Sequence, residues 1–162
     1  MEPPPICGPK DMGLVIYGLI SDTESDTQTR YSDFAANKGM PITELSAELI
    51  ALRWIAADYA VTQQYGESPE RNAVLDPFLD CVHRAVEPDL VQFLTGRICQ
   101  YAVALNQGGT SPSLSAGAAF ARLLFQRRQA SESDLYDAAL IGYTEFEAIG
   151  NAVREGLRLV RF

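Results

Sequence analysis

The stretch from Pro41 to Gly66 constrains the fold of this 162-residue chain more than any other. On a helical wheel of about 100° per residue, its apolar residues fall into two stripes on nearly opposite sides. One stripe contains Ile42, Leu45, Leu49, Leu52, Ala56 and Tyr59, and the other contains Ala47, Ile50, Trp54, Ala57 and Val61. A surface helix has one apolar face, whereas a helix with two lies inside a core or is shared with a second subunit. We therefore predict a central helix over about residues 41–65.

Residues 69–162 continue with helical patterns separated by short breaks. Helix starts are predicted where prolines or capping residues precede apolar periodicity, at Ser68-Pro69, Asp76-Pro77, Pro88, Ser111-Pro112 and Ser131. A long final helix is predicted after Ser131, because apolar and small residues recur there at alternating spacings of four and three. We predict an all-α fold, a compact bundle of five to six helices around the central helix, with residues 41–162 as the helical bundle domain.

Residues 1–40 are expected to form an N-terminal tail, a short apolar segment and an acidic loop within the same single domain. Met12–Ile20 is either a short strand or one buried helical turn, and we predict an extended segment there. Ser21–Thr29 is polar and acidic without apolar periodicity, which predicts a mobile loop.

Charge and cysteine content narrow the possible partners and the compartment. The net charge is −8, which argues against nucleic acid and against an anionic membrane surface. The longest apolar run is about half of what a membrane span needs, and the N-terminus lacks the features of a signal peptide. The three cysteines are an odd number at wide spacing, which favours a reducing compartment, so a cytoplasmic location is predicted.

The charges are unevenly distributed along the chain. Residues 1–89 hold 15 acidic and 6 basic side chains, whereas residues 90–131 hold no acidic residue and four arginines. Those arginines are Arg97, Arg122, Arg127 and Arg128. One interpretation is that helix packing alone decides where the charged residues lie, without any functional meaning. The other is a local basic surface on an acidic protein, suited to a small anion or to an acidic patch on a partner.

Few residues are candidates for catalysis or for ligand binding. Glu44 and Glu48 are four residues apart on the central helix, so both carboxylates can face one point. His83 is the only histidine and follows Asp80 by three residues, but one such pair is only part of a di-iron site. If a ligand cavity exists between the helices, Glu44, Glu48, Trp54, Tyr59 and His83 are its predicted lining. No metal site and no cofactor is predicted.

A second candidate site is the loop Gly108-Gly109-Thr110-Ser111, which directly precedes a predicted helix start. Free backbone N–H groups and hydroxyls at such a position can bind an anion. The loop lacks the Gly-Lys-Ser/Thr ending of a phosphate-binding P-loop.

The leading functional hypothesis is a non-enzymatic helical module that self-assembles, as a homodimer, and binds another protein. The doubly apolar central helix and the long final helix motivate it. The alternative is a protein that binds a small ligand or a cofactor such as a metal or haem near the central helix. A third hypothesis is an enzyme that uses Glu48 or His83 as a general base.

Overall fold

The structure, a computed structural model, describes residues 7–109 and 111–162. Its helices are α1 (Pro9–Ser21), α2 (Thr23–Arg30), α3 (Ser32–Asn37), α4 (Ile42–Tyr65), α5 (Pro69–Ala85), α6 (Pro88–Gln107), α7 (Pro112–Leu124) and α8 (Glu132–Leu157). The described residues contain no strand, only an isolated backbone bridge between Cys7 and Val160. The prediction of an all-α bundle is confirmed, and residues 41–162 supply α4 to α8.

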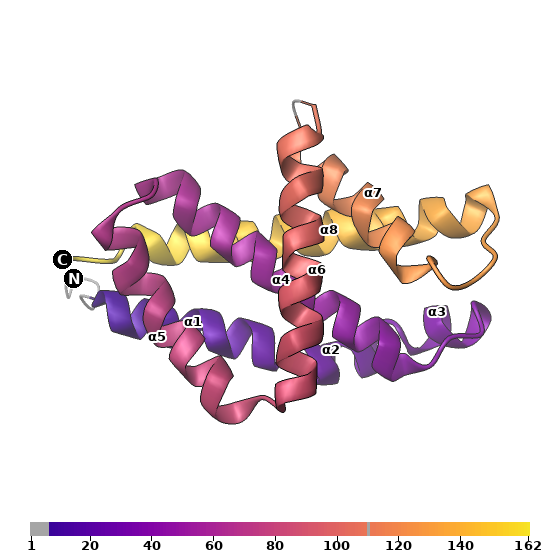
Figure 1. Cartoon of the computed structure of the whole chain (residues 1–162), viewed down its shortest axis with the longest axis horizontal. Coiled ribbons are helices and arrows are strands. Elements are labelled where there is room, and N and C mark those ends of the chain that lie inside the picture. The colour runs from indigo at the N-terminus through magenta and orange to yellow at the C-terminus, as the bar shows by residue number, and fades with distance from the viewer. Residues whose placement is uncertain (1–6, 110) are drawn as a thin grey trace, which may run out of the picture.

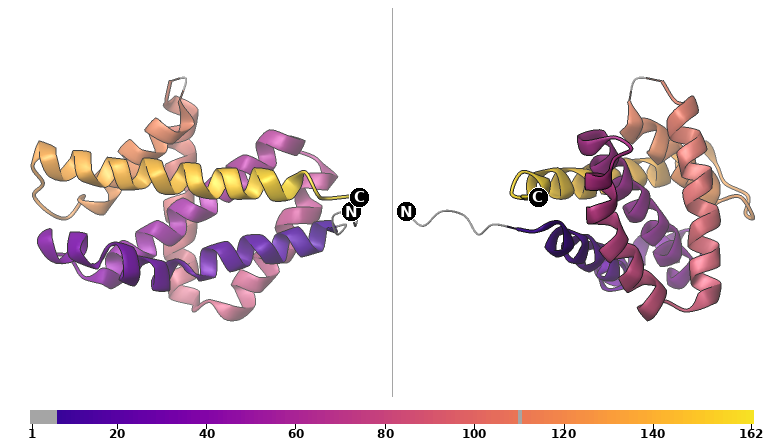
Figure 2. Two further views of the ribbon diagram at one scale, coloured as in Figure 1. Left: turned by 180° about the vertical axis from the view of Figure 1, so that it is seen from behind. Right: turned by 60° about the vertical axis from the view of Figure 1, so that its left-hand side comes forward.

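Helix α4 crosses the middle of the molecule, between α6 on one side and α8 with α2 on the other (Figures 1 and 2). Leu45, Leu49 and Leu52 from one stripe are fully buried, and Trp54 and Val61 from the other stripe are buried as well. Tyr59 packs on Phe146 of α8 with ring centroids 5.9 Å apart. Both apolar stripes of the central helix are therefore covered within one subunit.

Helix α8 runs along the back of the molecule, where α7 crosses it closely (Figure 2). Its N-terminus is fixed by a capping box, in which Ser131 Oγ accepts from the Asp134 N–H at 3.1 Å and the Asp134 carboxylate accepts from the Ser131 N–H at 3.0 Å. At the crossing, a Cβ on Gly142 would lie 2.8 Å from the Cβ of Phe120, and one on Gly117 would lie 2.6 Å from the carbonyl oxygen of Ala139. Glycine at both positions allows the two helices to approach this closely.

The predicted extended segment at residues 12–20 is wrong, because these residues belong to helix α1. Met12, Ile16 and Ile20 recur every four residues and are buried, which is the apolar stripe of a helix. Gly13, which weakens a helix in isolation, is a packing position: a Cβ there would lie 2.5 Å from the carbonyl oxygen of Val74 in α5.

The predicted loop at residues 21–29 is also wrong, since most of it forms α2. The buried side of this helix consists of Thr23 and Thr27, whose hydroxyls donate to the carbonyl oxygens of Ile20 and Thr23 at 2.6 Å each. Threonine can be buried in this way because its hydroxyl bonds to the preceding turn. A hydropathy pattern does not reveal such a face.

Helix α5 continues through Pro77, where a new helix start was predicted. Proline costs a backbone hydrogen bond inside a helix. Val74, Leu75, Phe78 and Val82 nevertheless form one buried stripe on both sides of Pro77, and burial of that stripe outweighs the lost bond.

A buried ion pair joins α4 to α8. The Arg53 side chain is 4% exposed and the Glu145 side chain 2%, and Arg53 Nη2 lies 2.9 Å from Glu145 Oε2. Arg53 Nη1 donates to Asp26 of α2 at 2.8 Å. The other Glu145 oxygen accepts from Tyr31 at 2.6 Å and from Arg30 at 3.1 Å. Burial and the bond to Glu145 raise the pKa of Tyr31 well above its ordinary value. The network attaches α2 to the core.

We predict that Arg53→Met lowers the free energy of unfolding by about 3 kcal/mol, because it leaves the buried Glu145 carboxylate with weaker partners. Replacing both partners, in Arg53→Met/Glu145→Met, removes the uncompensated charge and is expected to cost less than the single change. Urea denaturation measures both, with Arg84→Met as control because the Arg84 side chain is 80% exposed. A double variant less stable than Arg53→Met would contradict the prediction.

Candidate functional site

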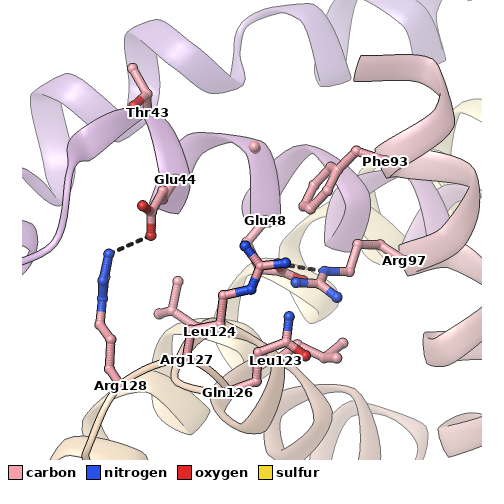
Figure 3. A pocket seen from close by; sticks show the side chains of 11 residues that line it. Thr43, Glu44, Glu48, Phe93, Arg97, Leu123, Leu124, Gln126, Arg127 and Arg128 are labelled. Atoms are coloured by element: carbon pink, nitrogen blue, oxygen red, sulfur yellow. Dashed lines mark hydrogen bonds and ion pairs between the residues drawn. The ribbon is translucent and has the colours of Figure 1, made fainter. Parts of the chain in front are cut away.

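A cleft of about 420 Å³ lies where α4, α6 and the end of α7 meet (Figure 3). Its lining residues come from the first turns of α4, from the middle of α6 and from α7 with the turn that follows it. They are Thr43, Glu44, Ala47, Glu48, Phe93, Arg97, Leu123, Leu124, Gln126, Arg127 and Arg128. We call this site the α4–α6–α7 cleft. Three arginines and two glutamates supply its charges.

Glu48 is the buried acid of the cleft, with only 3% of its surface exposed. Its Oε2 accepts from Arg97 Nε at 2.9 Å, and its Oε1 accepts from the hydroxyl of Tyr101 at 3.0 Å. Burial raises the pKa of Glu48 above its ordinary value of 4.5, while Arg97 and the Tyr101 hydroxyl oppose that rise. Burial and the neighbouring Glu48 also raise the pKa of Tyr101 well above 10.0.

Arg97 is held in one orientation by several partners. Besides Glu48, its Nη1 donates to the Gln100 side chain at 3.0 Å, and its guanidinium lies over the ring of Phe93, 4.9 Å from the centroid. The amide oxygen of Gln126, in the orientation that satisfies both of its polar atoms, accepts from Arg97 Nη2 at 2.6 Å. The cation is therefore fixed before any ligand arrives.

Arg127 and Arg128 bring more hydrogen-bond donors than the cleft has acceptors. Arg128 Nη2 pairs with Glu44, but its buried Nε has no hydrogen-bond partner among the described residues. Arg127 forms no ion pair with any acidic residue in the described part of the chain. Figure 3 shows its side chain extending toward Glu48 and Arg97. The cleft therefore has an excess of positive charge that an anion could satisfy.

The structure brings together only two of the five residues predicted to line a ligand cavity. Glu44 and Glu48 both line the α4–α6–α7 cleft. Trp54 is in the core, edge-on to Phe78 with centroids 5.1 Å apart, and Tyr59 packs on Phe146. His83 is exposed on α5 and lines neither this cleft nor a polar cluster.

The predicted anion loop contains a helix-capping contact at Ser111, and its anion binding stays a prediction. Gly108 ends α6, and Ser111 Oγ accepts from the backbone N–H of Leu114 at 3.3 Å at the start of α7. Gly108 lies so close to Ser115 that any Cβ would collide with it, whereas Gly109 has open space around it. Thr110 lies outside the described residues.

Sequence reasoning identified Arg97, Arg127 and Arg128 as bases of an acid-free stretch but did not place them beside Glu44 and Glu48. It missed Phe93 altogether. The available indication was the charge distribution, since three of the four arginines of residues 90–131 line this cleft. Glu145, the buried partner of Arg53, was also missed, because a single glutamate in a long amphipathic helix looks solvated.

Two further findings concern metals and membranes. Among the described residues, no three His, Cys, Asp or Glu side chains are grouped closely enough to hold a metal ion. No helix in the described ranges combines the length and the hydropathy that a bilayer span requires.

We predict a characteristic pH dependence for Glu48→Gln. Because burial raises the pKa of Glu48, the folded protein holds this proton more tightly than the unfolded chain does. The stability that the proton contributes is fully present below the unfolded value, near 4.5, and is lost as pH rises through the folded pKa. Wild type should therefore lose stability relative to Glu48→Gln as pH rises from 4.5. Urea denaturation between pH 4 and pH 8 measures the difference; a difference that is constant, or of opposite sign, would show that Arg97 and Tyr101 outweigh burial.

Comparisons with protein-family models, with curated proteins and with solved structures found no match to this chain.

Proposed function

We propose that this protein is a non-catalytic binding module that holds a carboxylate or phosphate group in the α4–α6–α7 cleft. The observation that carries the proposal is the pairing of a fixed arginine, Arg97, with a nearby arginine, Arg127, that has no acidic partner among the described residues. Guanidinium groups present several donors in a planar arrangement that matches these anions. An anion beside Arg97 would give Arg127, which is exposed, the anionic partner that it lacks among the described residues.

The rest of the cleft restricts the kind of ligand. Its volume, about 420 Å³, suits a small molecule or a few residues of a peptide. Phe93, Leu123 and Leu124 give it an apolar part beside the arginines. We infer a ligand that carries an anionic group next to an apolar one.

A binding role is favoured over catalysis by the state of Glu48. Both of its oxygens are engaged, one by Arg97 and one by Tyr101, so neither is free to accept a proton from a substrate without breaking a buried hydrogen bond. His83, the other candidate base, does not line the cleft. A reducing, cytoplasmic location belongs to the proposal and is supported by the unpaired thiols of Cys7, Cys81 and Cys99.

Isothermal titration with inorganic phosphate and with citrate tests the proposal. We expect Arg127→Ala to weaken binding by roughly tenfold, since hydrogen bonds to charged groups contribute about 1.5–3 kcal/mol each. Arg84→Ala removes an exposed arginine of α5 outside the cleft and serves as the matched control. Absence of binding in wild type, or equal binding by Arg127→Ala and wild type, would refute the proposed site.

Self-association is a second candidate function, and the exposed apolar side chains of α8, not the central helix, support it. The apolar faces that motivated a homodimer are covered within the subunit. However, Tyr136, Leu140 and Tyr143, at spacings of four and three along α8, are 70%, 54% and 37% exposed. An apolar stripe of this kind can pair with its counterpart in a second copy.

We predict that, if this stripe forms a homodimer, Leu140→Lys converts the dimer to monomer, because a buried lysine in an apolar interface is costly. Native mass spectrometry of both proteins provides the measurement. Gln63→Lys, which adds the same charge at an exposed position of α4, is the control. A wild-type monomer at high micromolar concentration would exclude this second function.

A further inference from the structure

A second cleft, of about 490 Å³, lies between α6 and α7 and adjoins the first. It is lined by Cys99, Gln100, Val103, Arg122, Leu123 and Gln126. Leu123 and Gln126 also line the α4–α6–α7 cleft. The two clefts therefore share part of their lining, and we call the two together the α6–α7 groove.

The groove has an unmatched cation in each half. Arg127 belongs to the first cleft and Arg122 to the second, and neither forms an ion pair within the described residues. Residues 90–131, which supply most of the groove, contain no acidic side chain, although the whole chain has a net charge of −8. Glu44 and Glu48 of α4 pair with Arg128 and Arg97, so Arg127 and Arg122 leave the groove with a net positive charge.

The lining shared by the two clefts consists of Leu123, which is buried, and Gln126, whose amide oxygen accepts from Arg97. Leu123 lies on the boundary between the clefts, and Val103 of α6, which is 53% exposed, lines the second cleft. An occupant that uses the whole groove thus meets one arginine without an ion pair among the described residues in each cleft, with the exposed apolar side chain of Val103 in the second cleft. A single phosphate or citrate ion can pair with only one of the two arginines, Arg127 or Arg122.

We propose that the α6–α7 groove binds an extended acidic segment of a partner protein, with an acidic side chain in each of the two clefts and an apolar side chain against Val103. This inference rests on the proposed function, whose anion site becomes one half of the groove. Charge complementarity selects the partner. A nucleic acid fits less well, because the net charge of −8 on the whole chain repels a long polyanion.

The probe is the hexapeptide amide Glu-Glu-Leu-Leu-Glu-Glu with a fluorescent label on its N-terminus. The full chain is titrated into it, binding is followed by fluorescence anisotropy, and acetyl-glutamate amide is measured by competition. The same peptide with lysine in place of glutamate is the negative control. We expect the acidic peptide to bind at least roughly tenfold more tightly than acetyl-glutamate amide, because two ion-paired ends act together. Binding should weaken as salt is added.

Arg122 distinguishes the groove from the single anion site. We expect Arg122→Ala to weaken peptide binding by roughly threefold to fivefold, as for an exposed ion pair, and to leave phosphate binding unchanged. Arg127→Ala should weaken both, and Arg84→Ala neither.

Four outcomes would overturn the inference. One is phosphate binding without tighter peptide binding, which would leave the proposed anion site intact. The second is an Arg122→Ala variant that binds the peptide as wild type does. The third is tighter binding of a labelled hexanucleotide than of the peptide. The fourth is self-association of the wild type that Arg122→Glu abolishes, which would assign the groove to a second copy of this chain. If neither phosphate nor peptide binds, the proposed function itself fails.

Discussion

Burial of α4 on both of its apolar sides is the constraint on which the arrangement of the other helices depends. A helix with two apolar stripes has to be enclosed, and this chain encloses it with α8 and α2 on one side and α6 on the other. The middle part of α4 is also buried between these two stripes, at Glu48 and Arg53, whereas Glu44 near its start is exposed. Arg53 and Glu48 are therefore taken out of water and need partners from other helices.

The two buried charged side chains, Arg53 and Glu48, find their partners in different ways. Arg53 meets acidic groups from two helices, Glu145 and Asp26, and Glu145 in turn accepts from Tyr31 and Arg30. Donors and acceptors balance there, and the result is a fixed structural connection. Glu48 meets Arg97 and Tyr101, while Arg127, which lines the same cleft, forms no ion pair among the described residues. This imbalance, at a site open to solvent, separates a candidate binding site from a structural ion pair.

The sequence predicted the long elements well and the short polar ones poorly. Helices α4 and α8 have enough apolar residues at regular spacing for the helical period to be evident, and the start of α8 is marked by the capping residue Ser131. Helix α2 buries threonines instead of aliphatic residues, so its buried side has no apolar pattern. In α1 the buried apolar stripe has only three residues, and the glycines beside them argued against a helix. In α5, local chemistry at Pro77 predicts a break, but the buried stripe on both sides of Pro77 keeps the helix continuous.

The cleft could be predicted only in part. Glu44 and Glu48 are related by a helical spacing, which is a local property that a sequence shows. Arg97 lies on α6 and Arg127 lies in the turn after α7, and no spacing along the chain predicts that they line one cleft with the two glutamates. What the sequence does show is the absence of acids from residues 90–131, and this absence has a physical consequence. Because no acidic residue lies in this part of the sequence, the ion pairs of its arginines are formed with acidic residues far away in the sequence. The other arginines of this part form no ion pair among the described residues.

The same reasoning changes how a partner is expected to be recognised. The apolar surface that suggested assembly is largely used to enclose α4, so it cannot also provide most of the energy of association. What distinguishes the α6–α7 groove is charge of the opposite sign to the rest of the molecule. Such a surface increases the rate of encounter and the selectivity more than the affinity. A partner held in this way would exchange readily, and its binding would be sensitive to ionic strength. A role in transient recognition follows more naturally from this surface than a role in a permanent complex.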